Sequence, residues 1–270
     1  MTRGFVAVVV VAVFVITGCT TGQPSGGPSA SPSVAAPSLT PPSLATPTMA
    51  PAPTTSPPSP AASTGVASVQ GGPLAAGTYT MGLLWDDCPQ PRTPGCSPSP
   101  AHDAMRITFT VPDGWSGVNP DAIWLTDKGM GYPDGAGLLF GRGSWLLSEP
   151  CTKAQHAVAP DISVGSTVDD FVNAVTEHPL LDVTEPVDVT LAGYSGKYLE
   201  LQVPTDISMC EVYRPWDPGI YAQGPGNRWH LWILDVDGLR FMVQSTDHKG
   251  TSKEHRKELQ AIVDSITIEP

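Results

Sequence analysis

The chain has 270 residues and a formal net charge of −12, from 26 acidic and 14 Lys or Arg side chains. Every acidic residue lies at or after Asp86, and no stripe of Lys and Arg interrupts the acidic region. Because an acidic domain repels phosphate backbones, we expect no nucleic-acid partner.

Residues 1–18 have the pattern of a secretory signal. Arg3 precedes an apolar run from Phe5 to Thr17, which would rise only ~20 Å as a helix, whereas a bilayer core needs ~20 residues. The sequence Ile-Thr-Gly-Cys that ends at Cys19 matches the lipobox of bacterial lipoproteins. This resemblance implies that Cys19 becomes a diacylglyceryl-modified N-terminus on the extracytoplasmic face of the cell membrane. A general secretory signal and a marginal span that contains Cys19 by chance are the alternatives.

Residues 19–73 have the composition of a tether. They consist almost entirely of Ser, Pro, Thr, Ala and Gly, without a charge or an aromatic ring. Such a segment buries too little apolar area to offset the entropy of ordering it, so we expect disorder. Its contour reaches ~150 Å in polyproline-II geometry, enough to lift a domain off a membrane. Ser and Thr beside Pro are also typical of O-glycosylated stalks.

Residues 74–270 are expected to form a single domain, in which three segments have the alternating pattern of half-buried strands. The first, 105–111, ends at the turn signal Pro112-Asp113-Gly114. Segments 187–191 and 199–203 are predicted to form an antiparallel hairpin. A second hairpin is predicted from 229–236 and 239–243 around Asp237-Gly238. Its sequence Leu-Trp-Ile-Leu is apolar on both faces, which indicates a central strand covered on both sides.

Two segments have helical periodicity. In 166–178, an apolar stripe is formed by Val168, Phe171, Val172 and Val175, and Ser166 with Asp169 predicts a capping-box variant. In 251–265, Thr251 with Glu254 predicts a fuller capping box, and the stripe consists of Leu259, Ile262 and Val263. The charged residues Lys253, Arg256 and Lys257 alternate with Glu and are interpreted as a solvated helix face.

Alternating strands with two amphipathic helices predict an α+β fold, an antiparallel sheet with helices packed on it. The element order and the phrases FTVPDGW, GYSGKYLELQVP and WILDVDG resemble secreted domains of actinobacterial lipoproteins, whose fold is a PsbP-like α/β/α sandwich. The resemblance covers roughly residues 104–270. It implies that fold and a role in binding or assembly, since members of this kind are mostly of unknown activity.

Four cysteines remain after Cys19, namely Cys88, Cys96, Cys151 and Cys210. An even number outside the membrane predicts disulfides, with three connectivities to choose from. We favour Cys88–Cys96 as a local staple of a Pro-rich loop, together with Cys151–Cys210. A zinc site that includes Cys96 and His102 is the rival, but the spacing of zinc motifs is missing and no metal is expected.

Two short motifs are interpreted as turns. The sequence Gly-Tyr-Ser-Gly at 193–196 lacks the final glycine of a nucleophile elbow and lies within a hairpin. The sequence Asp-Val-Asp-Gly at 235–238 lacks the remaining ligands of a calcium loop. Six histidines are scattered, and none belongs to a recognised catalytic phrase. No catalytic residue is assigned, and no cofactor is expected.

The segment 211–232 is the richest in candidate binding residues. It is rich in Gly and Pro and contains the candidates Tyr213, Arg214, Trp216, Tyr221, Arg228 and Trp229. Exposed rings would stack on sugars or anchor a protein, and Arg would pair with a carboxylate. The alternative, which we favour, is that the rings cover the edge of the core. Trp232 lies in the predicted central strand and is assigned to the core.

The predicted function is a lipid-anchored binding or assembly module of the cell envelope. Its expected partners are the membrane, through the lipid on Cys19, and a cell-wall polymer or an envelope protein. An envelope hydrolase with an unrecognised active site is the alternative, because catalytic groups are brought together by folding rather than by sequence adjacency.

Overall fold

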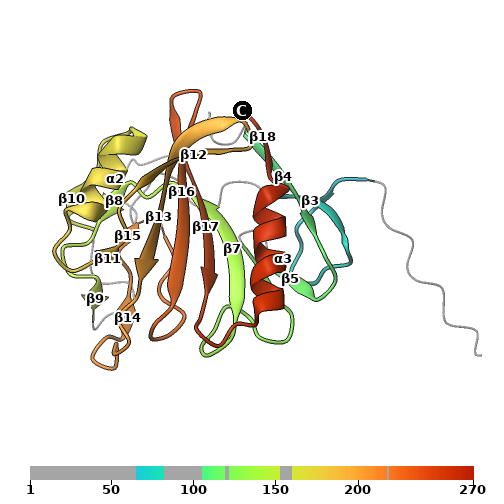
Figure 1. Cartoon of the computed structure of the whole chain (residues 1–270), viewed down its shortest axis with the longest axis horizontal. Helices are drawn as coiled ribbons and strands as arrows, with labels where there is room; N and C mark the ends of the chain where they lie inside the picture. Colours follow the sequence, from blue (N-terminus) through green and yellow to red (C-terminus); the bar gives the residue numbers. More distant parts are fainter. Residues whose placement is uncertain (1–64, 82–104, 119–121, 153–159, 218) are drawn as a thin grey trace, which may run out of the picture. The chain divides into compact units, whose positions relative to one another are not determined.

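The computed structural model describes residues 65–81, 105–118, 122–152, 160–217 and 219–270. All of them belong to one structural unit, Pro57–Pro270. This part of the chain is mostly β-sheet and contains two helices, α2 (Val168–Thr176) and α3 (Lys253–Asp264) (Figure 1). The predicted signal, the lipidation site Cys19, most of the tether and the Cys88–Cys96 pair lie outside the described residues.

The largest sheet has nine strands, and all its pairings are antiparallel. Their order is β11–β13–β16–β17–β7–β6–β5–β2, and β12 also pairs with β13. The strands are β2 (Gly72–Pro73), β5 (Trp115–Val118), β6 (Ala122–Leu125), β7 (Ala136–Gly141), β11 (Asp182–Val183), β12 (Val187–Leu191), β13 (Tyr194–Gln202), β16 (Arg228–Val236) and β17 (Leu239–Asp247).

Three smaller sheets complete the described fold. One has the order β1–β3–β4–β18, with β1 (Ala67–Ser68), β3 (Gly77–Met81), β4 (Arg106–Val111) and β18 (Thr267–Glu269). A second has the order β10–β8–β15, with β10 (Ile162–Ser163), β8 (Trp145–Leu146) and β15 (Trp216–Asp217). The third pairs β9 (Cys151–Thr152) with β14 (Val212–Tyr213).

Both predicted hairpins are confirmed. Strands β12 and β13 pair around Ala192-Gly193, and β16 and β17 pair around Asp237-Gly238. At the second turn both central residues have positive φ, 52° for Asp237 and 84° for Gly238. This is the backbone twist that a two-residue hairpin loop requires, and Asp-Gly adopts it at low cost.

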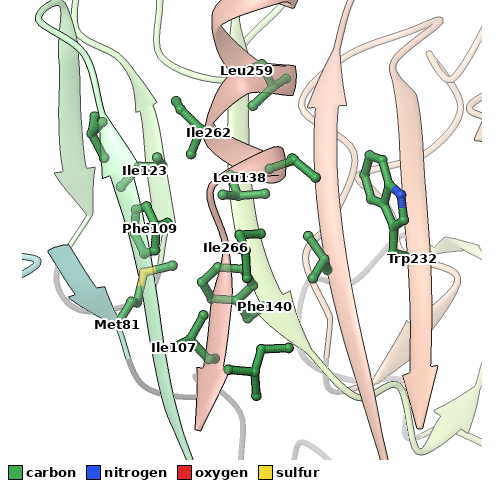
Figure 2. Close-up of a cluster of buried hydrophobic side chains, with 14 of the residues drawn as sticks. Met81, Ile107, Phe109, Ile123, Leu138, Phe140, Trp232, Leu259, Ile262 and Ile266 are labelled. Atoms are coloured by element: carbon green, nitrogen blue, oxygen red, sulfur yellow. The ribbon is translucent and has the colours of Figure 1, made fainter. Parts of the chain in front are cut away.

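The nine-stranded sheet is covered on both faces. On one face, α3 contacts β7 and β17, and Leu259 and Ile262 belong to one buried cluster with Leu138, Phe140 and Trp232 (Figures 1 and 2). Side chains of β4 and β3 join this cluster. On the opposite face, α2 contacts β13 and β16 and contributes Phe171, Val172 and Val175. Since Leu231–Leu234 are all buried and divide between the two clusters, β16 is the predicted doubly covered central strand.

The N-cap of each helix lies one residue after the predicted N-cap. Thr167, rather than Ser166, caps α2, and its hydroxyl accepts from the N–H of Asp170, whose carboxylate accepts in return from the N–H of Thr167. Ser252, rather than Thr251, caps α3. The hydroxyl of Thr251 is instead buried and donates to the carbonyl of Gly135. Adjacent hydroxyl residues offer equivalent caps, and the tertiary contact of Thr251 decides between them.

The folded part begins before the predicted boundary at residue 74. Strand β1 pairs in parallel with β3, and β2 pairs with β5. These two-residue strands have no hydrophobic alternation, so pairing with β3 and β5 orders a sequence that resembles a tether. Neither helix of the described part is long and apolar enough to cross a membrane.

Candidate functional site

Three of the candidate aromatic residues belong to the core. Tyr213, Trp216 and Trp229 are 4%, 0% and 0% exposed. The Trp216 ring lies edge-on to Phe171 and Trp229, with ring centroids 5.6 and 5.1 Å away. Edge-to-face packing of this kind stabilises a core beyond the area that it buries. These rings therefore cover the α2 face of the sheet, as the core interpretation of the segment expects, and present no stacking surface.

The other candidates in this segment differ in their surroundings. Tyr221 is 47% exposed. The guanidinium group of Arg214 pairs with the buried carboxylate of Asp217, with Nη1 and Oδ1 3.1 Å apart. Arg228 is the first residue of β16, and it lies on the face of the sheet opposite to Trp229, because successive side chains of a strand alternate. Of the predicted binding residues, only Arg228 lines the positively charged cavity described below.

Arg228 belongs to a row of residues at one end of the nine-stranded sheet. The antiparallel register aligns Gln202 of β13, Arg228 of β16, Asp247 of β17 and Ala136 of β7. The next row on the same face is Glu200, His230, Ser245 and Leu138. Polar groups of β13, β16 and β17 therefore occupy the α3 face at this end, whereas apolar side chains of β16 occupy it further along the strand.

Asp247 is the centre of this polar cluster. Oδ1 accepts hydrogen bonds from Nε and Nη2 of Arg228, and Oδ2 lies 3.2 Å from Nε2 of His230. Nε of Arg256, from α3, lies 3.5 Å from Oδ1. Burial by itself raises the pKa of Asp247, but the hydrogen bonds from His230 and Arg228 outweigh it and hold the pKa below its ordinary value. The carboxylate is therefore ionised and balances part of the positive charge around it.

His230 links Asp247 to a second pair of polar groups. Its Nδ1 lies 2.9 Å from the hydroxyl of Tyr198, which donates to Glu200 over 2.8 Å. Burial, followed by the hydrogen bond to Glu200, raises the pKa of Tyr198 well above its ordinary value, so the phenol stays protonated. Both ring nitrogens of His230 thus have partners within the cluster.

This pairing opposes a catalytic interpretation of the cluster. His230, Ser245 and Asp247 line one small cavity of about 210 Å³ and are the residue types of a hydrolase triad. However, Nε2 and Nδ1 of His230 face Asp247 and Tyr198, and no hydrogen bond joins Ser245 to His230 among the described residues. A serine nucleophile needs the imidazole as its base, and here the imidazole has no nitrogen left for it.

A larger cavity of about 560 Å³, hereafter the cationic pocket, lies beside the cluster. Three of its lining residues are the cations Arg228, Lys249 and Arg256. The others are neutral: Tyr132, Gln202, Thr205, Pro225 and Gly226. Although the chain carries a net charge of −12, no carboxylate lines this pocket in the part that the structure describes. The pocket is therefore a local concentration of positive charge on an acidic protein, which attracts anions.

Asn227 fixes the rim of the pocket. It is fully buried, and its amide nitrogen donates to the hydroxyl of Thr246 and to the carbonyl of Asp247. Its amide oxygen accepts from Nε1 of Trp229 over 2.7 Å. One side chain thus joins the beginning of β16 to the end of β17, immediately beside Arg228.

Most of the cationic pocket is not visible in sequence patterns. Tyr132, Lys249 and Arg256 come from three separate segments that only tertiary folding brings to Arg228. The prediction of a solvated helix face is wrong for Arg256, because its Nη2 donates to the carbonyls of His248 and Lys249 and its Nε faces Asp247. The sequence contained one signal of the site. Arg228 and His230 are polar residues at positions of β16 whose later equivalents on the same face are buried in the core.

The remaining motifs behave as turns. Gly193 follows Ala192 in the β12–β13 turn, and Asp235 accepts a hydrogen bond from the N–H of Gly238 in the β16–β17 turn. Within the described ranges, no three His, Cys, Asp or Glu side chains are arranged to hold a metal ion. Cys96 and His102, the residues of the rival zinc site, lie outside those ranges, as does Cys88.

The predicted disulfide between Cys151 and Cys210 is present. Their Cα atoms are 5.0 Å apart, across 59 residues of sequence. The bridge lies beside the β9–β14 pair, where Val212 aligns with Thr152 and Tyr213 with Cys151. It therefore ties the segment before α2 to the loop that follows β13.

No protein-family model matches the sequence, and no curated protein gives a significant match. Two solved structures show a distant likeness. One is a protein of Bacteroides thetaiotaomicron, at 12% identity over 61% of this chain and 45% of that protein, with a TM-score of 0.31. The other is LpqN of Mycobacterium tuberculosis, described as involved in cell envelope biogenesis, at 14% identity over 62% of this chain and 85% of that protein, with a TM-score of 0.32. At these scores neither likeness carries an argument about this chain.

Proposed function

We propose that this chain is a lipid-anchored, extracytoplasmic binding module of the cell envelope, and that its ligand is an anion held in the cationic pocket. The observation that carries the proposal is the convergence of Arg228, Lys249 and Arg256 on one cavity of an otherwise acidic chain. A concave site with a few convergent polar groups is the form that ligand sites take. The partners of His230 support binding over hydrolysis.

The anchor is the second part of the proposal. The apolar run after Arg3 and the lipobox that ends at Cys19 support acylation of this cysteine. Two or three acyl chains hold a protein on a membrane stably. A Pro-rich tether then gives the pocket access to a cell-wall polymer or to an envelope protein at a distance from the bilayer.

The family is the third part of the proposal. We assign residues 104–270 to the PsbP-like sandwich of actinobacterial lipoproteins. The phrases FTVPDGW, GYSGKYLELQVP and WILDVDG support the assignment. The positions of α2 and α3 on opposite faces of the nine-stranded sheet agree with α/β/α layering.

Anion binding is tested by thermal unfolding of the full chain in chloride, acetate, phosphate and sulfate at matched ionic strength. An anion at a concentration ten times its Kd stabilises the folded state by about 1.4 kcal/mol. This raises the Tm of a domain of this size by about 3–6 °C. Lys249→Glu is expected to abolish the rise. Lys253→Glu, the same charge change at an exposed position of α3 outside the pocket, is expected to preserve it.

Equal melting temperatures in all four salts would refute the pocket as the site. So would an equal loss of the anion-induced rise in Tm in Lys249→Glu and Lys253→Glu. Acylation is tested separately with Cys19→Ala, which is expected to release the protein from the membrane fraction or to leave an uncleaved precursor. Unchanged mass and membrane partitioning would contradict the lipid anchor without affecting the pocket.

A further inference from the structure

The guanidinium group of Arg228 has one edge already occupied. Nε and Nη2, which together form the fork that matches a carboxylate, both donate to Oδ1 of Asp247. Nη1 has no hydrogen-bond partner among the described residues. A ligand in the pocket therefore meets the Nη1 end of Arg228 rather than its Nε–Nη2 fork.

Arg256 and Lys249 also have donors left for a ligand in the described part of the chain. Nη2 of Arg256 donates to the carbonyls of His248 and Lys249 over 2.7 and 3.1 Å, and Nε faces Asp247 at 3.5 Å. This leaves Nη1 of Arg256 for a ligand. Nζ of Lys249 has no ion-pair partner within the described part of the chain. The pocket thus offers separate donors from three different side chains.

This donor set suits a tetrahedral oxyanion better than a planar carboxylate. A carboxylate has two oxygens and is recognised best by the parallel N–H groups of a guanidinium fork, and the Nε–Nη2 fork of Arg228 is already occupied by Asp247. A phosphoryl group has three acceptor oxygens that diverge, so three separate donors can each reach one.

The charge of the site points the same way. Among the side chains that line the pocket, Arg228, Lys249 and Arg256 contribute three positive charges, and Asp247, which faces both arginines, offsets one of them. A phosphate monoester carries about −1.5 to −2 at neutral pH and matches this balance, whereas carboxylates and sulfate esters carry one negative charge. Tyr132 adds an aromatic ring that lines the pocket and yet is 62% exposed. Such a ring offers an apolar face to a sugar.

We infer that the cationic pocket recognises a phosphate monoester carried on a ring, such as a sugar phosphate. The three separate donors hold the phosphoryl group, and Tyr132 packs against the ring. This inference rests on the proposed function, since it names the ligand class of the same pocket.

The test is isothermal titration of the Cys19→Ala chain, which lacks the acyl anchor, with glucose 6-phosphate, glucose 6-sulfate, glucuronate, glucose and inorganic phosphate. We expect glucose 6-phosphate to bind roughly tenfold more tightly than glucuronate, because one further charge-assisted contact is made. A similar preference over the sulfate ester is expected, because the phosphate carries more negative charge. Glucose alone should show no binding. The ring should improve affinity several-fold over inorganic phosphate.

Two pairs of variants identify the side chains responsible. Lys249→Gln is expected to weaken the binding of glucose 6-phosphate about tenfold, and Lys253→Gln to leave its affinity unchanged. Tyr132→Ala should remove the advantage of glucose 6-phosphate over inorganic phosphate, whereas Tyr221→Ala, at an exposed tyrosine outside the lining, should keep it. Thermal unfolding of each variant confirms that it is folded.

The outcomes separate the inference from the proposed function. Glucuronate or glucose 6-sulfate binding as tightly as the phosphate would overturn the inference and leave an anion-binding module. Binding to vesicles of phosphatidic acid but not to glucose 6-phosphate would assign the phosphate to a lipid headgroup and overturn the sugar ring. Vesicles of phosphatidylcholine are the control. If no anion binds, both the inference and the proposed function fail.

Discussion

Nε2 of His230 lies 3.2 Å from Oδ2 of Asp247, across the β16–β17 pair. The carboxylate that balances the arginines of the cationic pocket therefore also holds an imidazole, whose other nitrogen meets Tyr198. Asp247 is only 2% exposed, so its negative charge is stabilised by these neighbours rather than by water.

Asp247→Asn is expected to destabilise the fold by about 3 kcal/mol, because it leaves Arg228 and Arg256 without their buried counter-charge. Urea unfolding at pH 7 measures the change. Asp188→Asn is the control, since Asp188 forms a surface pair with Lys197 and its side chain is 90% exposed. The control should cost below about 1 kcal/mol. Equal losses in the two variants would contradict the role of Asp247.

The lowered pKa of Asp247 predicts acid sensitivity. A carboxyl group whose pKa is lower in the folded state stabilises the protein fully above its unfolded value of 3.8. This contribution is lost as pH falls through the lower pKa of the folded state. We therefore expect the difference in unfolding free energy between wild type and Asp247→Asn to shrink in acid. A difference that is constant from pH 7 to pH 2 would contradict the prediction.

His248 predicts a second pH dependence, at higher pH. Burial lowers its pKa below 6.5, although the nearby Met130 carbonyl opposes the shift. The unfolded chain then takes up a proton before the folded chain does, so stability is greatest above about pH 6.5 and falls as pH drops toward the folded-state pKa. Urea midpoints between pH 8 and pH 5 measure this slope. His248→Gln should flatten it, and an unchanged slope would contradict the assignment.

Measuring the stability of alanine variants distinguishes buried aromatic candidates from exposed ones. Trp216→Ala removes a fully buried ring and is expected to cost about 3–5 kcal/mol. Tyr221→Ala, at a ring that is 47% exposed, should cost below about 1 kcal/mol. Urea unfolding of the two variants compares them directly. A small loss for Trp216 would return it to the set of candidate binding residues.

The disulfide between Cys151 and Cys210 closes a long loop and is expected to contribute about 4 kcal/mol in the chain-entropy model. Unfolding of wild type and of the Cys151→Ser/Cys210→Ser double variant measures this difference. Non-reducing peptide mapping should link Cys151 to Cys210, and it also tests the predicted Cys88–Cys96 pair. A link between Cys151 and Cys88 would refute both pairings.

Local signals in the sequence were sufficient for the two helices, the two hairpins and strand β4, but not for strands such as β2, β6 and β7. Ile107, Phe109 and Val111 alternate with polar residues because β4 buries one face, and Asp237-Gly238 forms its turn through its own backbone preferences. The two helices follow from their apolar stripes. Their caps were displaced by one residue because Ser166 precedes Thr167 and Thr251 precedes Ser252. In the second pair, a tertiary hydrogen bond of Thr251 decides between the two residues.

The site depends on contacts that no local pattern records. Arg228 was a candidate because of its loop, but Asp247 became relevant only through the strand register that places it opposite Arg228. Tyr132 precedes Arg228 by about a hundred residues, and Arg256 lies on a helix whose pattern resembles an ordinary charged surface. Pairing across strands and docking of α3 create the pocket, so its chemistry is a property of the tertiary structure.

The buried amide of Asn227 has a kinetic consequence. Because it ties the beginning of β16 to the end of β17, the backbone on both sides of Arg228 is held in place before any ligand arrives. A ligand then meets a preformed site and little ordering of the chain accompanies capture. Association should therefore proceed in a single step at a rate that falls with added salt, and differences in affinity between ligands should appear mainly in how slowly each one leaves.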